Sequence, residues 1–281
     1  MDKLKKRHFY NGIDYVLDGE SKKLILLKEF HEKLLNKTLW GSFGFKKIGG
    51  SNIGDVLLKN EKFHSEFSAF AKISYLNLPI LDPKYVNAGI MIEPKVIEAI
   101  EQISNYKVQT FDPKKYNYDY FSDKDEIVGG IPDGYVEEKK IILEIKTTKE
   151  SNFENWEKYG VPNSYLKQSQ LYSFLMGVEE FAIVATFLKN EDYENPENYP
   201  IKKRKIKSYK YKINKEQVLD DLEKVKNWYH KHTKTGVSPE YNVIEDKDLL
   251  DYLKCQNEEE WLNLLKKWDS EGKVKVEYGN W

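Results

Sequence analysis

The segment between residues 129 and 149 constrains the fold of this chain more than any other. Residues 141–145 form an apolar, β-branched run that is typical of a buried strand, and Tyr135-Val136, which precedes the charged turn 137–140, is predicted to be its partner. The pattern predicts a β-hairpin at the centre of an α/β domain.

Three charged side chains lie on this hairpin: Asp133, Glu144 and Lys146. Because side chains alternate between the two faces of a strand, Glu144 and Lys146 share one face, and Asp133 enters from the adjacent strand. Charged groups in apolar surroundings need a metal ion or each other. Hard carboxylate oxygens suit Mg²⁺ or Mn²⁺, ions that activate water and bridge a phosphate. The trio therefore indicates a divalent-metal site.

The Glu-x-Lys spacing alone is not specific, because 32% of the residues are charged and the same spacing occurs at Glu93, Glu245 and Glu271. Glu144 differs from these in lying inside an apolar strand with Pro-Asp-Gly upstream. Taken by itself, the hairpin leaves two interpretations of equal weight, a metal site and a solvated β-turn.

Length and composition favour one main globular domain. The 281 residues are 40% hydrophobic and 14% aromatic, and no apolar run approaches the length of a membrane span. The first twelve residues are basic but lack the apolar core of a signal peptide, so we expect a cytoplasmic protein without membrane contact. Cys255 is the only cysteine, which excludes a disulfide framework within the chain and a four-cysteine zinc or iron–sulfur site.

The 45 basic and 46 acidic residues nearly cancel, so a nucleic-acid footprint must be local. The clearest candidate is the run 202–215, which holds eight basic residues and no acidic one. Contact with a DNA backbone and an edge strand whose lysines prevent aggregation explain this run equally well.

Further elements can be placed around the hairpin from periodicity and turn residues. Helices are predicted at 23–36, 163–176 and 215–232, an antiparallel strand pair at 181–188 and 205–213, and an appended helical segment in the last forty residues. His230 and His232 are two residues apart, which is the wrong spacing for one helix face, so both are predicted to be surface residues.

A capped helix start is predicted at Ser51, which we expect to be the N-cap residue. Lys46 and Lys47 precede it, and exposed backbone N–H groups at a helix start favour anions. An ordinary capped helix is the simpler interpretation, and a phosphate site is the alternative.

A second helix is predicted over residues 88–105, with Ile90, Ile97 and Ile100 on its apolar face. Pro94 places the start of the regular helix close to Glu93. The Glu93 carboxylate either compensates the helix dipole or serves as an additional metal ligand that faces the hairpin.

Five motifs, taken in order, resemble the λ-exonuclease/YqaJ-type viral recombinase branch of the PD-(D/E)xK nuclease superfamily. They are IGGSNIG at 48–54, NAGIMIEP at 87–94, GGIPDG with LEIKTTK within 129–149, YLKQSQLYSFLMG at 165–177 and WYHKHTKTGVSPE at 228–240. The resemblance covers roughly residues 40–240. It implies a restriction-endonuclease-like core, in which a central mixed β-sheet is flanked by helices.

For the metal site, the resemblance implies Glu93, Asp133 and Glu144 as ligands, with the backbone carbonyl of Ile145 contributing. Lys146 would orient or deprotonate the attacking water, or would stabilise the pentavalent phosphate. The sequence does not decide between these roles.

For the substrate, the resemblance implies that Gln168, together with Tyr165, supports the catalytic lysine or the scissile phosphate. Ser51, with Lys46 and Lys47, would bind a terminal phosphate. The best-known member of the family has an arginine upstream of this serine, whereas this chain has lysines, which lack the bidentate fork of arginine.

We therefore expect a nuclease core at 41–240, an N-terminal extension at 1–40 and a helical appendage at 241–281. The expected activity is hydrolysis of DNA with Mg²⁺, for which Mn²⁺ can substitute, by an exonuclease acting on duplex ends. The family alone implies a single-strand-annealing protein as a partner, and the sequence leaves homo-oligomerisation open. The alternatives are a restriction-type endonuclease and a catalytically inactive DNA-binding module, which the intact trio argues against.

Overall fold

The computed structural model describes residues 3–59 and 61–278, and the chain divides into two compact units with interleaved boundaries. The first unit is built from the residues up to Ile48, from Asp55–Pro83 and from Glu223 onward, and the second from Gly49–Gly54 and Lys84–Leu222. The chain passes between the units within β3 (Ile48–Gly49), within α2 (Gly50–Leu57), between Pro83 and Lys84, and within α8 (Lys215–Thr235). The segments expected as extension and appendage both fall in the first unit.

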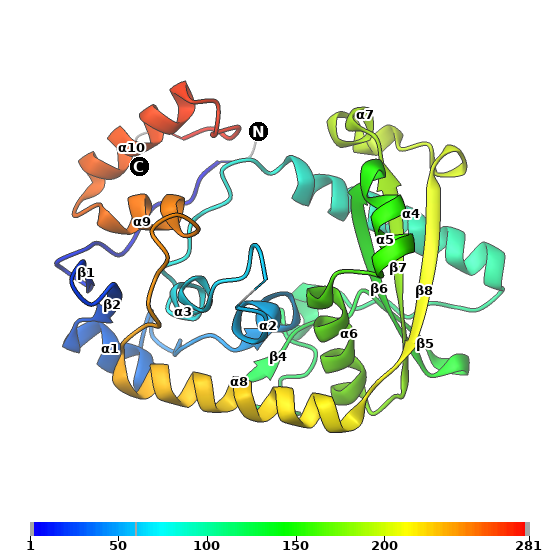
Figure 1. Cartoon of the computed structure of the whole chain (residues 1–281), viewed down its shortest axis with the longest axis horizontal. Coiled ribbons are helices and arrows are strands. Elements are labelled where there is room, and N and C mark those ends of the chain that lie inside the picture. Colours follow the sequence, from blue (N-terminus) through cyan, green and yellow to red (C-terminus); the bar gives the residue numbers. More distant parts are fainter. Residues whose placement is uncertain (1–2, 60, 279–281) are drawn as a thin grey trace. The chain divides into compact units, whose positions relative to one another are not determined.

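A four-stranded mixed sheet forms the centre of the second unit (Figure 1). Its order is β5 (Gly134–Val136), β6 (Ile141–Lys149), β7 (Glu180–Leu188) and β8 (Lys205–Lys212). The predicted hairpin is confirmed, since β5 and β6 pair antiparallel with Gly134 opposite Leu143. The pair β6 and β7 is parallel, and the pair β7 and β8 is antiparallel as predicted. The expected α/β fold with a central mixed sheet is therefore present.

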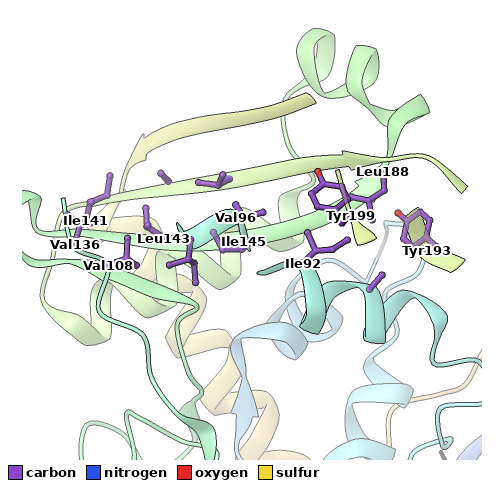
Figure 2. Close-up of a cluster of buried hydrophobic side chains, with 14 residues drawn as sticks. Ile92, Val96, Val108, Val136, Ile141, Leu143, Ile145, Leu188, Tyr193 and Tyr199 are labelled. Atoms are coloured by element: carbon purple, nitrogen blue, oxygen red, sulfur yellow. The ribbon is translucent and has the colours of Figure 1, made fainter. Parts of the chain in front are cut away.

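One face of this sheet packs on α4 (Lys84–Ser104), and Figure 2 shows the resulting core. Ile92 and Val96 of α4 are fully buried in the same cluster as Leu143 and Ile145 of β6. Ile90, predicted on the buried face, is instead 64% exposed. The buried stripe follows a spacing of four residues from Ala88, and Ile90 falls between its members.

The predicted start of α4 is wrong. The helix begins at Lys84, nine residues before Glu93, and Pro94 lies inside it. A proline inside a helix removes one hydrogen bond and is tolerated when packing compensates, and here Ile92 and Val96 anchor the helix on both sides of the proline.

The other face of β6 is reached by α6 (Asn163–Met176), which ends at Gly177 as predicted. Gly177 adopts the left-handed conformation with φ of 75°, which glycine reaches without steric cost. Between β6 and α6 lies the short helix α5 (Phe153–Tyr159), and α7 (Asn190–Glu194) lies in the connection from β7 to β8.

The basic run 202–215 contains β8, the edge strand of the sheet. Several of its cations are paired within the unit: Arg204 with Asp192, Lys207 with Glu157 and Lys210 with Glu180. This pairing favours the interpretation as a charged edge strand over a free DNA-binding stripe.

The first unit begins with the hairpin of β1 (Tyr15–Asp18) and β2 (Lys23–Leu26), followed by α1 (Lys28–Leu35). The helix predicted from residue 23 therefore starts later, because Leu24 and Leu26 are buried with a period of two and form a strand instead. The unit also contains α3 (Glu66–Ile73), α9 (Lys247–Lys254) and α10 (Glu258–Ser270).

Two buried polar side chains, Arg7 and His232, make hydrogen bonds inside the first unit. Arg7 donates to the carbonyl of Tyr252 at 2.6 Å and to the Tyr15 hydroxyl at 2.8 Å. His232, predicted to be a surface residue, is buried, and its Nδ1 bonds the carbonyl of Val237 at 2.7 Å. His230 is exposed, as predicted.

Among the described residues, no helix combines the length and the apolar character that crossing a membrane would require.

Candidate active site

Asp133 is the residue directly before β5, and its side chain extends the hydrogen bonding between the two strands of the hairpin. The β5–β6 ladder stops at Leu143, and the Oδ2 atom of Asp133 accepts a hydrogen bond from the backbone N–H of Ile145 at 2.6 Å. The carboxylate thus takes the place of the next backbone acceptor. Its position is fixed by the strand itself.

Glu144 and Lys146 lie on the same face of β6, as the alternation predicts. Lys146 Nζ donates to Glu144 Oε1 at 2.6 Å, and the Glu144 side chain is only 1% exposed. The second carboxylate oxygen, Oε2, is buried and has no hydrogen-bond partner in the described part of the chain. A solvated β-turn does not fit this burial, so the second of the two interpretations left open by the sequence is wrong.

Helix α6 presents two side chains to the lysine. Gln168 is buried, and its Oε1 accepts from Lys146 Nζ at 3.2 Å. The half-buried Tyr165 places its ring 4.8 Å from the same ammonium. One turn of helix separates these residues, so the 3.6-residue period brings both onto the face that covers β6.

Glu93 approaches the hairpin from α4. Burial, together with the carboxylate of Asp133, raises the pKa of Glu93 to about 7. Burial and Asp133 likewise raise the pKa of Glu144 to about 8, and burial raises the pKa of Asp133 despite the opposing charge of Lys146. Three carboxylates that resist ionisation together form a site that favours a cation.

Lys146 behaves in the opposite way. Burial alone would lower its pKa, but the carboxylates of Glu144 and Asp133 outweigh burial and raise it. The side chain is therefore an ammonium group with two fixed acceptors, Glu144 and Gln168. Such a group donates hydrogen bonds and is poorly suited to accept a proton.

The side chains of the site offer oxygen ligands for a divalent metal ion. The oxygens available are carboxylates, which suit Mg²⁺ or Mn²⁺, and among the described residues the buried Oε2 of Glu144 accepts no hydrogen bond. Within residues 3–59 and 61–278, however, no three histidine, cysteine, aspartate or glutamate side chains already converge on one point as a metal cluster would. The ligand type of these residues suits a divalent ion, and their side chains would have to adjust to surround it.

The residues predicted to bind a terminal phosphate are distributed over both units. Ser51 is the second residue of α2 and not its N-cap, because the helix begins at Gly50. Its side chain is exposed and donates to Asn52 Oδ1 at 3.3 Å. Lys46 and Lys47 belong to the first unit, where the ammonium of Lys46 lies 4.2 Å from the ring of Tyr75.

Asp119 was not singled out from the sequence, yet it supports the segment that leads to Asp133. Its Oδ1 accepts from the backbone N–H of Gly130 at 2.9 Å, and a Cβ at Gly129 would lie 2.5 Å from the same atom. The two glycines before Pro-Asp were the available signal, since they indicate a close approach to the backbone.

The sequence resembles a known protein family and two mycoplasma proteins. Residues 39–179, half of the chain, match the family described as YqaJ-like viral recombinase domain. The uncharacterized protein MG373 of Mycoplasma genitalium is 29% identical over 247 residues, which cover 73% of this chain and 85% of that protein. Its Mycoplasma pneumoniae homologue is 24% identical over 237 residues, covering 70% and 84%.

Among solved structures, the fold resembles LHK-Exo, an alkaline exonuclease from Laribacter hongkongensis, in its complex with dAMP. The TM-score is 0.50 at 16% identity, covering 66% of this chain and 87% of that chain. This likeness concerns the fold, and it agrees with the mixed sheet flanked by helices.

Proposed function

This chain belongs to the YqaJ-like viral recombinase domain family, and we propose that it is a metal-dependent DNA exonuclease that acts on duplex ends during recombination. Membership of this family supports a nuclease associated with recombination. The observation that carries the reaction type is the hairpin, on which Asp133, Glu144 and Lys146 lie together, with Lys146 held by Gln168 of α6. A DNA-binding module without activity would not need this buried and mutually repelling set of charges.

In this proposal Glu93, Asp133, Glu144 and the carbonyl of Ile145 hold Mg²⁺, or Mn²⁺ in its place. When bound, the ion polarises the phosphate and lowers the pKa of water. Burial, and after it the charge of Asp133, raises the pKa of Glu93 and of Glu144, and a cation bound there would offset both effects.

Lys146 supplies charge to the scissile phosphate. Two of its three donors are directed to Glu144 and Gln168, which leaves one for a phosphate oxygen or for the attacking water. These two fixed hydrogen bonds support a role in electrostatic stabilisation of the transition state. Gln168 and the Tyr165 ring restrict where the ammonium can lie.

Ser51, Lys46 and Lys47 remain proposed contacts for a terminal phosphate, on the strength of the sequence resemblance. The exposure of Ser51 in the first turn of α2 is consistent with such a contact, because the first N–H groups of a helix attract anions.

The test is digestion of end-labelled linear duplex DNA, bearing either a 5′-phosphate or a 5′-hydroxyl, beside a supercoiled circle without ends. We expect degradation of the linear DNA with Mg²⁺ or Mn²⁺, none with EDTA, and none with Asp133→Asn as the matched inactive control. Calcium, with a larger and looser coordination shell, should bind without supporting turnover. Cutting of the circle would identify an endonuclease, and hydrolysis in EDTA would contradict the metal site.

A further inference from the structure

The connection between β7 and β8 is much longer than the pairing of these strands requires. Antiparallel neighbours can be joined by a turn of about two residues, whereas residues 189–204 intervene here and contain α7. We call this segment the β7–β8 excursion. Its side chains Tyr193 and Tyr199 lie in the same buried cluster as Ile92 of α4 (Figure 2). The excursion therefore packs on the helix that carries Glu93.

A bidentate ion pair closes the excursion at its base. Arg204 donates from Nε to Asp192 Oδ2 at 2.6 Å and from Nη2 to Asp192 Oδ1 at 2.8 Å. Asp192 is only 2% exposed and also accepts from the backbone N–H of Lys189 at 2.8 Å. Because a bidentate pair holds both groups in one orientation, the excursion is an ordered part of the second unit.

The contact of the excursion nearest to the site is made by the half-buried Lys95, two residues after Glu93. The Lys95 ammonium donates to the backbone carbonyl of Pro196 at 3.2 Å and to that of Glu197 at 2.5 Å. Backbone acceptors do not swing away as an exposed carboxylate side chain can. Lys95 is therefore tied to the main chain of the excursion.

The helical period places Lys95 and Glu93 on opposite flanks of α4. Successive residues of a helix are rotated by about 100°, so Lys95 lies about 200° from Glu93 around the axis. The buried stripe of Ile92 and Val96 lies between these two flanks and rests on the sheet. A rotation of α4 about its axis would roll the helix on this stripe and carry Glu93 away from Asp133. The two hydrogen bonds of Lys95 oppose that rotation.

We propose that the β7–β8 excursion is a clamp that positions Glu93 for the metal ion, with Lys95 as its positioning residue. Lys95 acts by fixing the rotation of α4 and is not itself a ligand. The inference rests on the proposed function in one respect, which is the assignment of Glu93 as a metal ligand. It adds that a segment outside the catalytic hairpin sets the affinity for the metal.

The test is Lys95→Met, which keeps the apolar part of the side chain and removes the ammonium. Binding of Mn²⁺ to the full chain without DNA, followed by the electron paramagnetic resonance signal of the free ion, gives a Kd that needs no cleavage. Groups that orient metal ligands typically contribute roughly 10- to 100-fold in affinity, so we expect Mn²⁺ to bind about tenfold more weakly to Lys95→Met.

Two further variants complete this comparison. Lys95→Arg can still donate to both carbonyls and should recover most of the Mn²⁺ affinity. Lys210→Met is the matched control, because it removes an exposed lysine of the same unit that pairs with Glu180 at 2.7 Å, and it should bind Mn²⁺ like the wild type. Equal Kd values for Lys95→Met and Lys210→Met would overturn the clamp.

Glu93→Gln distinguishes a failure of the clamp from a failure of the proposed metal site. It should weaken Mn²⁺ binding at least as much as Lys95→Met, and the double variant should bind no more weakly than Glu93→Gln alone. Multiplied losses would show that Lys95 does not act through Glu93 and would overturn the inference. Wild-type affinity in Glu93→Gln would instead remove Glu93 from the metal site.

Hydrogen exchange tests the clamp without any metal. In EDTA, the backbone amides around Glu93 should lose protection in Lys95→Met and keep it in Lys210→Met, because only the first substitution releases α4 from the excursion. Unchanged protection of α4 in Lys95→Met would overturn the clamp, even if the wild-type protein bound no Mn²⁺.

Discussion

Asp133 combines two roles that a pair of substitutions can separate. Its Oδ2 accepts from the Ile145 N–H at 2.6 Å where the β5–β6 ladder has ended, and its charge belongs to the proposed metal site. Asp133→Asn keeps an acceptor at this place and removes the charge. Asp133→Ala removes both, and leaves a buried strand N–H without its side-chain acceptor.

The expected magnitudes differ accordingly. An unsatisfied buried donor costs about 1–3 kcal/mol, so Asp133→Ala should lower the free energy of unfolding by that amount. Asp133→Asn should stay within about 1 kcal/mol of the wild type, because the weaker neutral hydrogen bond is offset by the loss of a carboxylate that burial disfavours. Both variants should lose at least about a hundredfold in cleavage, since both lack the charge.

Urea unfolding in EDTA, followed by tryptophan fluorescence, measures the free energy of unfolding, and digestion of linear duplex DNA in Mg²⁺ measures the cleavage rate. Asp123→Asn is a suitable control, because Asp123 is an exposed aspartate of the same unit, beside Lys124 at 3.6 Å. Asparagine and alanine variants of equal stability would refute the hydrogen-bond role. Wild-type cleavage by Asp133→Asn would refute the metal site.

Three further outcomes are expected. Lys146→Ala should reduce cleavage by about a hundredfold or more while DNA binding in Ca²⁺, measured by anisotropy, stays near the wild type; retained cleavage would show that the lysine is structural. Linear duplex with a 5′-phosphate should be degraded up to roughly ten- to a hundredfold faster than its 5′-hydroxyl counterpart, and Ser51→Ala with Lys47→Ala should shrink that ratio; equal wild-type rates would argue against the phosphate contact. Burial lowers the pKa of His232 below the ordinary value of about 6.5, so the unfolded chain binds the proton more tightly and the folded protein loses stability as the pH drops below that value. Between about pH 7 and 5, the Tm of His232→Asn should therefore fall less than the Tm of the wild type. Parallel plots of Tm against pH for the two proteins would contradict this.

The local elements around the site followed from the sequence because their signals are local. The apolar run 141–145 and the charged turn before it specify the hairpin, and alternation along the strand places Glu144 and Lys146 on one face. The helical period of α6 brings Tyr165 and Gln168 to the same side, and Gly177 ends the helix. These signals act over a few residues, so no tertiary information was needed.

Two of the wrong predictions, the start of α4 and the helix at 23–36, concern places where packing outweighed a local signal. Pro94 lies within α4 because Ile92 and Val96 are anchored in the core, and Leu24 and Leu26 form a strand because β1 pairs with them. The sequence alone does not reveal whether a segment with both helical and strand-like signals will pair with a neighbouring strand.

Tertiary structure alone decided how the charges of the site affect one another. The burial of Glu144 and the approach of Glu93 from α4 bring together segments about forty to fifty residues apart in the sequence. The sequence determined which residue types are available on each strand and helix. Burial and distance, which exist only after the elements have packed, determined their charge and their partners, because electrostatic energies depend on the surrounding dielectric and on separation.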